Sequence, residues 1–322
     1  MRRVIALELV GLKKLDCDLY NEEGSIIYNK GTEFTPEIFM MLTHSKIFKR
    51  DEEHLVLPAS PIESQKLIIG KDYEILEKKP QPSEFKSIID EDKKENLIKG
   101  VKDVLQCAVE KTPVKIQTCI EATEIILDEV SNKLEKINNL NELRIHDYYT
   151  FSHNINVAII SAIIGKELGF SESKLKDLVF SALLHDVGKM QIPREILYKP
   201  GSLTPDEMQT IKKHVEYGYE FIIKTLNLPD AVGKVALSHH ERWEGHGYPY
   251  GLKGNQISEF SQIVAVADVY DALVSEKVYR GPVESIEAMR ILLTEEASSF
   301  NSKILNKFVY MAVIKSETVH LL

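Results

Sequence analysis

Near the middle of the chain stands an apolar run that ends in a histidine and an aspartate, Leu183-Leu184-His185-Asp186-Val187-Gly188-Lys189. The apolar residues predict a buried helix, and Gly188 predicts that this helix ends or bends there. A neutral imidazole beside a carboxylate at a buried helix end is costly unless something binds both groups. Asp186 also has two oxygens, with which it could bridge two cations.

Two further apolar segments deliver residues of the same chemical type. His239 and His240 follow the apolar residues 231–238, and Asp268 follows the apolar residues 262–267. Each alone has an ordinary explanation, as a helix cap, a hydrogen-bonded core histidine or a buried acid with a partner. Three such sites in one region favour a shared metal centre. Imidazole and carboxylate ligands without thiolate suit iron or manganese better than zinc in an open hydrolytic site.

The sequence around these sites predicts helices almost throughout, from about residue 95 to the end. Between residues 116 and 137 the apolar side chains recur at roughly the spacing of a buried helical face. Thr204-Pro205-Asp206-Glu207 predicts a helix start, because Thr204 can cap the helix and Glu207 completes a capping box. Further starts are expected at Ser171 and at Pro229. We therefore predict a mainly α protein with an all-α bundle.

A different pattern precedes this bundle. Residues 1–75 mix short apolar runs with turn residues, as in Asn21-Glu22-Glu23-Gly24 followed by Ser25-Ile26-Ile27-Tyr28, which predicts short strands around tight turns. Residues 76–98 contain two prolines close together, Pro80 and Pro82, and a dense run of charged residues, which predict a linker. The expected organisation is a small α+β module at 1–75, a linker at 76–98 and the helical domain at 99–322.

Composition excludes several classes of protein. The net charge of −9 argues against a broad hold on the phosphates of DNA or RNA. The 322 residues contain no apolar run long enough for a membrane span, and the N-terminus does not resemble a signal peptide. Cys17, Cys107 and Cys119 have no metal-binding spacing, so we expect reduced thiols in a cytoplasmic protein.

A series of short motifs occupies residues 148–282. It comprises Tyr149-Thr150-Phe151-Ser152-His153-Asn154-Ile155-Asn156-Val157, His185-Asp186-Val187-Gly188-Lys189, Ile192-Pro193, Lys199-Pro200-Gly201, Ile211-Lys212-Lys213-His214, His239-His240-Glu241-Arg242-Trp243-Glu244-Gly245-His246-Gly247-Tyr248-Pro249, Gly251-Leu252-Lys253-Gly254 and Ala265-Val266-Ala267-Asp268-Val269-Tyr270-Asp271-Ala272-Leu273. The series, in this order, closely resembles the HD-GYP family, a branch of the HD-domain phosphohydrolases. A Gly-Tyr-Pro triplet alone would mean nothing, whereas the whole series is specific.

The resemblance implies a metal cluster whose ligands are His153, His185, Asp186, His214, His239, His240 and Asp268. Family members bind non-haem iron or manganese, and Asp186 matches their bridging ligand. Two ions are therefore expected, with iron favoured and manganese as the alternative. Some members carry a glutamate one turn before the first histidine and bind a third ion. The corresponding residue here is Tyr149, which favours a binuclear site.

The resemblance also implies a phosphodiesterase that hydrolyses cyclic di-GMP to pGpG, with GMP as the alternative final product. A hydroxide that bridges the metals would attack phosphorus in line with the departing 3′ oxygen. Asp186 and Lys189 are the implied catalytic residues. Lys189 would contact the phosphate or protonate the leaving group, unless it only stabilises a helix terminus. The candidate substrate contacts are Tyr248, Gly247, Lys277, Arg280, Arg242 and Lys253.

Several of these assignments have alternatives. Arg242 could serve loop packing, and Lys253 could be a solvated charge. Asn154 replaces the usual serine beside His153, which is expected to change the hydrogen bonds around that ligand. Lys277 stands where arginine is common, and a lysine cannot make a planar bidentate phosphate contact.

Other functions remain open from the sequence. The chain could be a cyclic di-GMP receptor with little turnover, or it could hydrolyse a related cyclic dinucleotide such as cyclic GMP-AMP. The module at 1–75 could bind a protein partner, and a homodimer is an open alternative to a monomer.

Overall fold

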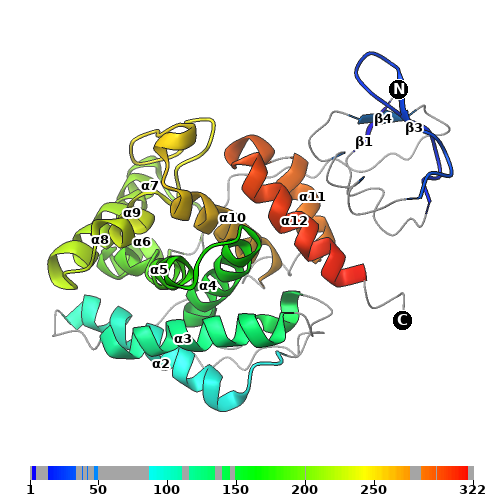
Figure 1. Ribbon diagram of the computed structural model, residues 1–322. Helices are drawn as coiled ribbons and strands as arrows, with labels where there is room; N and C mark the ends of the chain where they lie inside the picture. The colour runs from blue at the N-terminus through cyan, green and yellow to red at the C-terminus, as the bar shows by residue number, and fades with distance from the viewer. Residues whose placement is uncertain are drawn as a thin grey trace.

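The computed structural model of the chain describes residues 2–4, 14–33, 38, 42, 47–49, 87–110, 116–134, 140–145, 149–199, 201–275, 284–294 and 296–317. The strands lie before residue 50, and the helices whose bounds are described lie after residue 90 (Figure 1). The prediction of a mainly α protein with a small mixed N-terminal part is confirmed.

The N-terminal strands form one antiparallel sheet in the order β1-β4-β2-β3. They are β1 (Arg2–Val4), β2 (Leu19–Tyr20), β3 (Ile26–Tyr28) and β4 (Ile47–Lys49). The turn between β2 and β3 forms where the sequence predicted one. The side chain of Asn21 accepts hydrogen bonds from the backbone N–H groups of Glu23 and Ser25, at 3.1 and 2.9 Å. Gly24 has a φ of 80°, which a glycine adopts without strain.

The longer helices are α2 (Glu91–Glu110), α3 (Ile116–Lys133), α4 (Tyr149–Glu167), α5 (Glu172–Leu183), α6 (Arg194–Leu197), α7 (Pro205–Lys212), α8 (His214–Glu220), α9 (Asp230–Ser238), α10 (Glu259–Val274), α11 (Ser285–Thr294) and α12 (Ser302–Glu317). Short helical turns join them at η2 (Leu140–Leu143), η3 (Val187–Gln191), η4 (Phe221–Thr225), η5 (Gly254–Gln256) and η6 (Ala297–Ser299).

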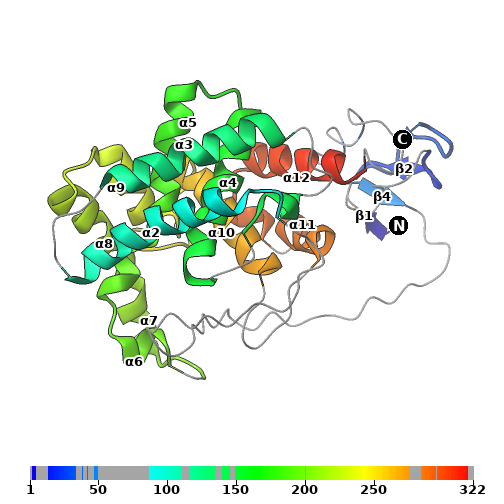
Figure 2. The ribbon, with the colours of Figure 1, turned by 90° about the horizontal axis from the view of Figure 1, so that it is seen from below.

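Helix α4 lies at the centre of the helical region and contacts α2, α3, α5, α10 and α12. Both Figure 1 and Figure 2 show α2 beside α3, with this pair covering one side of α4. The sequence explains the position of α4, because apolar residues cover the helix on all sides. Ile155, Ile159, Ile160 and Ile163 are all at most 1% exposed. The first turns of α4 therefore carry their polar side chains into the protein interior.

The predicted helix starts are confirmed. Thr204 and Glu207 form the expected reciprocal capping box at α7, with 3.2 Å from the Glu207 N–H to the Thr204 hydroxyl and 2.7 Å from the Thr204 N–H to the Glu207 carboxylate. Ser171 caps α5 through the N–H of Lys174, and α9 begins directly after Pro229.

The linker prediction is wrong for residues 91–98, which form the first turns of α2. Glu91, Asp92 and Glu95 are exposed, but Lys93 reaches Glu129 of α3 at 2.5 Å. The Glu129 side chain is only 2% exposed, and Leu97 is fully buried. Part of the charge in this stretch therefore joins two packed helices, and the rest covers the exposed face of α2. Residues 76–86 of the predicted linker lie outside the described residues.

Candidate metal centre

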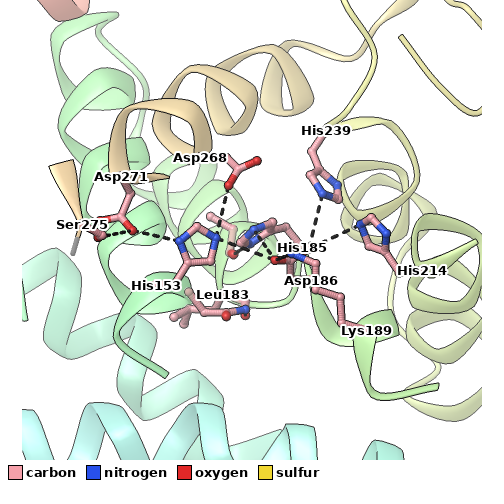
Figure 3. A network of polar contacts seen from close by, with 12 residues as sticks. His153, Leu183, His185, Asp186, Lys189, His214, His239, Asp268, Asp271 and Ser275 are labelled. Atoms are coloured by element: carbon pink, nitrogen blue, oxygen red, sulfur yellow. Dashed lines mark hydrogen bonds and ion pairs between the residues drawn. The ribbon is translucent and has the colours of Figure 1, made fainter. Parts of the chain in front are cut away.

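The ends of four helices and one side of a fifth bring the predicted ligands to one place (Figure 3). His153 lies on α4, His185 and Asp186 directly follow α5, and His214 begins α8. His239 and His240 directly follow α9, and Asp268 lies on α10. Residues from distant parts of the sequence thus meet around the end of α5.

Asp186 is at the centre of this cluster. Its Oδ1 lies 3.4 Å from the Nε2 of His214 and 3.6 Å from that of His239. Its Oδ2 lies 3.4 Å from the Nε2 of His185 and 3.7 Å from that of His153. Figure 3 shows His153 on one side of this carboxylate and His214 and His239 on the other. The two oxygens therefore face two different groups of imidazoles.

Backbone carbonyls orient three of the histidines. The Nδ1 atoms of His185, His214 and His239 lie 2.7, 2.8 and 3.0 Å from carbonyl oxygens in the preceding turn. Because a carbonyl only accepts, Nδ1 carries the proton and Nε2 presents its lone pair toward Asp186. This is the arrangement that fixes a histidine as a metal ligand.

The atoms that face one another have no hydrogen-bond partner among the described residues. They are the Nε2 atoms of His185, His214 and His239 and the Oδ1 atom of Asp186, all of them buried. Buried polar groups without partners are rare, and each costs about 1–3 kcal/mol. Four of them around one point are explained if a cation binds there.

The cluster can be divided into two overlapping ligand groups. In one group, Asp186, His214, His239 and His240 place ligand atoms within 4.8 Å of one another. In the other, His153 and His185 do so with the same Asp186. The donor set of imidazole nitrogens and a shared carboxylate fits one or two transition-metal ions. Asp268 belongs to neither group, and its Oδ1 instead lies 3.2 Å from the Nε2 of His153.

Burial and neighbouring charges keep most of the ligands in their metal-binding forms. Burial lowers the pKa of His214 to about 3 and that of His240 well below its usual value. Burial opposes ionisation of Asp186, but the nearby Lys189 and His185 hold the pKa of this carboxyl well below its usual value. A metal requires neutral imidazole and ionised carboxylate, and these groups already have those forms.

His153 differs from the other histidines. Burial alone would lower its pKa, but hydrogen bonds to Asp268 and Asp271 raise that pKa to about 10. Its Nδ1 donates to Oδ2 of Asp271 at 2.9 Å. The sequence alone did not indicate a role for Asp271. Asp271 lies three residues after Asp268, and this spacing, which places both carboxylates on one face of α10, could have indicated that Asp271 belongs to the site.

Gly188 allows the two halves of the ligand set to meet. A Cβ atom at this position would lie 1.9 Å from the carbonyl oxygen of His214 and 2.4 Å from the backbone nitrogen of Gly218. No side chain fits in that space. The glycine therefore lets η3, which follows Asp186, pack directly against the backbone of α8.

The Gly247-Tyr248-Pro249 loop covers the cluster. The ring of Tyr248 stacks on His240, with 4.8 Å between the centroids and 24° between the planes. The ammonium of Lys212 lies 5.0 Å from the centroid of the same ring. Tyr248 thus lies against the metal ligand His240, and its contact with a bound substrate stays a prediction.

Glu241 holds this loop in place. Its carboxylate is buried and accepts the backbone N–H groups of Tyr250 at 2.8 Å and Leu252 at 2.9 Å. Gly247 serves the same closure, because a Cβ there would lie 2.5 Å from the carbonyl oxygen of His240. We expected Gly247 to let the backbone approach a ligand, whereas its close neighbour is the backbone of the chain itself.

The other residues that were predicted to contact the substrate lie in different parts of the structure. Lys189 contacts Oδ2 of Asp186. Arg242 donates to Glu296 and Ser299, which is the loop packing considered above. Lys253 is exposed. Lys277 and Arg280 lie outside the described residues.

Asn154, which replaces the family's usual serine, is buried. Its amide donates to the carbonyl oxygen of Leu183 at 3.0 Å. This bond ties α4 to the end of α5, immediately before His185.

Comparison with known proteins agrees with this fold and site. The family model described as "HD domain" matches residues 124–304, so the chain belongs to the HD-domain family. Within this family it is a member of the HD-GYP branch, whose motifs form the cluster described above.

Two curated relatives are informative. The chain is 40% identical over 185 residues to the cyclic di-GMP phosphodiesterase of Thermotoga maritima, a match that covers 57% of this chain and 48% of that protein. It is 33% identical over 186 residues to the 3′3′-cGAMP-specific phosphodiesterase 2 of Vibrio cholerae, covering 57% of this chain and 36% of the relative. The chain thus spans about half or less of the length of these relatives.

One solved structure covers nearly the whole chain. It is a Bdellovibrio bacteriovorus protein described as HDG"Y"P, with a TM-score of 0.52 and 18% identity over 97% of this chain and 98% of that one. At this identity it supports the fold alone. Among the described residues, no helix is long and apolar enough to cross a membrane.

Proposed function

We propose that this protein is a metal-dependent phosphodiesterase that hydrolyses cyclic di-GMP to pGpG, with GMP as the alternative final product. The observation that carries the proposal is the set of buried ligand atoms around Asp186, which have no hydrogen-bond partner among the described residues. The resemblance to the cyclic di-GMP phosphodiesterase of Thermotoga maritima supports the substrate. The ligand set is proposed to hold two ions, iron or alternatively manganese, with Asp186 between them.

Bound ions would supply a nucleophile from water at neutral pH and would polarise the phosphoryl oxygens. The protein's own contribution is to orient the ligands and to cover the site. His185, His214 and His239 are fixed by backbone carbonyls. Asp186 presents one oxygen to each ligand group.

Lys189 is proposed to contact a substrate phosphate and to protonate the departing 3′ oxygen. Its ammonium lies against Asp186, and its side chain is 12% exposed. It is therefore beside the ligand atoms and still accessible from the surface of the site. Because ammonium groups bind phosphate oxygens as point charges, this position suits a substrate anion.

Tyr248 is proposed to orient the substrate. Burial raises the pKa of its phenol, with smaller contributions from Asp186 and Asp268, so that the hydroxyl remains a hydrogen-bond donor. The stacking of its ring on His240 fixes the direction in which the hydroxyl points. Lys277 and Arg280 are proposed to contact the phosphates, and Arg242 and Lys253 are retained as weaker candidates.

A second substrate is favoured by a specific observation. Several relatives of similar identity, including the Vibrio protein named above, are described as 3′3′-cGAMP-specific. Both cyclic dinucleotides present the same phosphodiester chemistry to the cluster and differ in one base. Competition between the two substrates at equal concentration distinguishes these activities.

We further propose that residues 1–75 form a regulatory or partner-binding module ahead of the catalytic domain, whose predicted start at residue 99 moves to residue 91, where α2 begins. Its small sheet is supported by the strand pairing. Homodimer formation is proposed as an alternative to a monomer.

The proposal is tested with protein purified without oxygen and loaded with Fe(II) or Mn(II). The wild-type protein should convert cyclic di-GMP to pGpG or GMP, and His185→Ala and Asp186→Ala should remove this activity. Failure of the iron-loaded wild-type protein to convert either cyclic dinucleotide would contradict the proposal. Tight binding of cyclic di-GMP without product would identify a receptor.

A further inference from the structure

A buried arginine stands behind the metal ligand His153. Arg144, which directly follows η2, is 3% exposed, and Asp271 of α10 is fully buried. Arg144 holds the Oδ1 atom of Asp271 through two nitrogens, with Nε at 3.1 Å and Nη2 closer. Its Nη2 also donates to the hydroxyl of Ser275 at 2.7 Å. Arg144 thus restrains both the carboxylate and the end of its helix.

The two oxygens of Asp271 have different partners. While Oδ1 accepts from Arg144, Oδ2 accepts from the Nδ1 of His153 at 2.9 Å and from the Ser275 hydroxyl at 3.1 Å (Figure 3). Because Nδ1 is occupied in this way, Nε2 is the atom of His153 that faces Asp268 and Asp186. The direction of this ligand atom therefore depends on how Asp271 is held.

His153 is unlike the three histidines oriented by backbone carbonyls of the preceding helical turn. Those carbonyls are part of the backbone and cannot rotate independently. The partner of His153 is a side chain from a different helix, and an aspartate side chain can rotate unless it is fixed. Arg144 provides that fixation, since its planar guanidinium holds Oδ1 through two N–H groups at once.

Arg144 is itself held by the helix that carries His153. The backbone N–H of Ile145 donates to Asn156 at 2.8 Å, and the amide of Asn156 donates back to the carbonyl oxygen of Ile145 at 3.1 Å. Asn156 lies three residues after His153 on α4. The ligand, its acidic partner and the arginine therefore form a closed loop of contacts between α4, α10 and the segment after η2.

We propose that Arg144 is a positioning residue, acting through Asp271, for the ion held by His153, His185 and Asp186. This inference rests on the proposed metal centre. It predicts a selective defect, because the second ligand group, formed by Asp186, His214, His239 and His240, does not include His153. Loss of Arg144 should weaken one bound ion and leave the other unchanged, whereas a merely structural loss should weaken both.

The test is a Mn(II) titration of the oxygen-free full-length protein, with free Mn(II) measured by electron paramagnetic resonance. In Arg144→Lys and Arg144→Met, one of the two ions should bind about 10- to 100-fold more weakly, the range found when the hydrogen-bond partner of a ligand is lost. His214→Ala should weaken the other ion. Arg290→Met is the matched control, because Arg290 pairs with Glu287 on α11 and should leave both affinities unchanged.

Thermal unfolding of each variant identifies those that remain folded. If Arg144→Met does not fold, Arg144→Lys decides, because it keeps the buried charge and loses only the two-nitrogen contact. A folded Arg144→Lys protein that binds both ions as the wild type does, or that binds both more weakly by the same factor, overturns the proposal. Failure of the wild-type protein to bind Mn(II) would instead refute the metal centre, and this is seen before any variant is measured.

Discussion

Replacing a metal ligand with an apolar residue should stabilise the metal-free protein while it removes metal binding. His214 is 1% exposed, and its Nε2 has no hydrogen-bond partner among the described residues. In His214→Leu the cost of that buried atom disappears, a gain of about 1–3 kcal/mol. The variant loses the bond from Nδ1 to the carbonyl oxygen of Ile211, which contributes about 1 kcal/mol. The metal-free variant should therefore match the wild type or exceed it by up to about 2 kcal/mol.

Bound metal should make the wild-type protein more stable than His214→Leu. A ligand that binds only the folded state stabilises it by about 2.7 kcal/mol when present at about 100 times its Kd. The wild-type protein should gain this amount from Mn(II), and His214→Leu should gain less because one group has lost a ligand. Urea unfolding with and without Mn(II) measures both quantities. His246→Leu is the control, because His246 is exposed and its replacement should change stability by less than about 0.5 kcal/mol.

The reasoning is refuted if metal-free His214→Leu is less stable than the wild type by more than about 2 kcal/mol, as expected when a well-satisfied core residue is lost. It is also refuted if Mn(II) stabilises this variant as much as the wild type.

Three further substitutions test other parts of the site. Gly188→Ala should destabilise the protein by about 1–3 kcal/mol or more and weaken metal binding, because the new Cβ would meet the backbone of His214. Gly218→Ala is the control in the same urea assay. Its new Cβ would have its nearest contacts at 3.3 Å, so this variant should lose less stability. Glu241→Ala should raise KM more than it lowers metal affinity, because it releases the loop that carries Tyr248; an unchanged KM would contradict this role. Lys189→Met should lower kcat by about 10²- to 10⁴-fold while the metal content stays the same. Steady-state kinetics and metal analysis measure these two quantities. A normal kcat would exclude Lys189 as the proton donor.

Much of this architecture could be predicted from the sequence, because local rules determine it. The start of α7 follows from the capping residues Thr204 and Glu207, and the burial of α4 follows from apolar residues on all its sides. His185, His239 and His240 stood out because they lie at the ends of apolar segments, where an unpartnered imidazole is costly. His153 and His214 follow no such segment, and only the resemblance to the HD-GYP motifs indicated them. These features require only neighbouring residues to be recognised.

The features that could not be predicted depend on contacts between distant residues. Arg144 and Asp271 are 127 residues apart, and neither belongs to a pattern that indicates the other. The charged residues 91–98 predict a linker when they are considered alone. The partner of Lys93 is the buried Glu129 of α3, which lies too far along the sequence for a local pattern to indicate it. The close packing at Gly247 likewise depends on how the loop folds back on His240.

The most direct measurement is the anomalous scattering of crystals grown without oxygen from iron-loaded protein, recorded on both sides of the iron absorption edge. Two peaks should lie on opposite sides of Asp186, one near His153 and His185 and the other near His214 and His239. Peaks elsewhere, or no peak at this cluster in iron-replete protein, would contradict the metal centre on which the proposed activity depends.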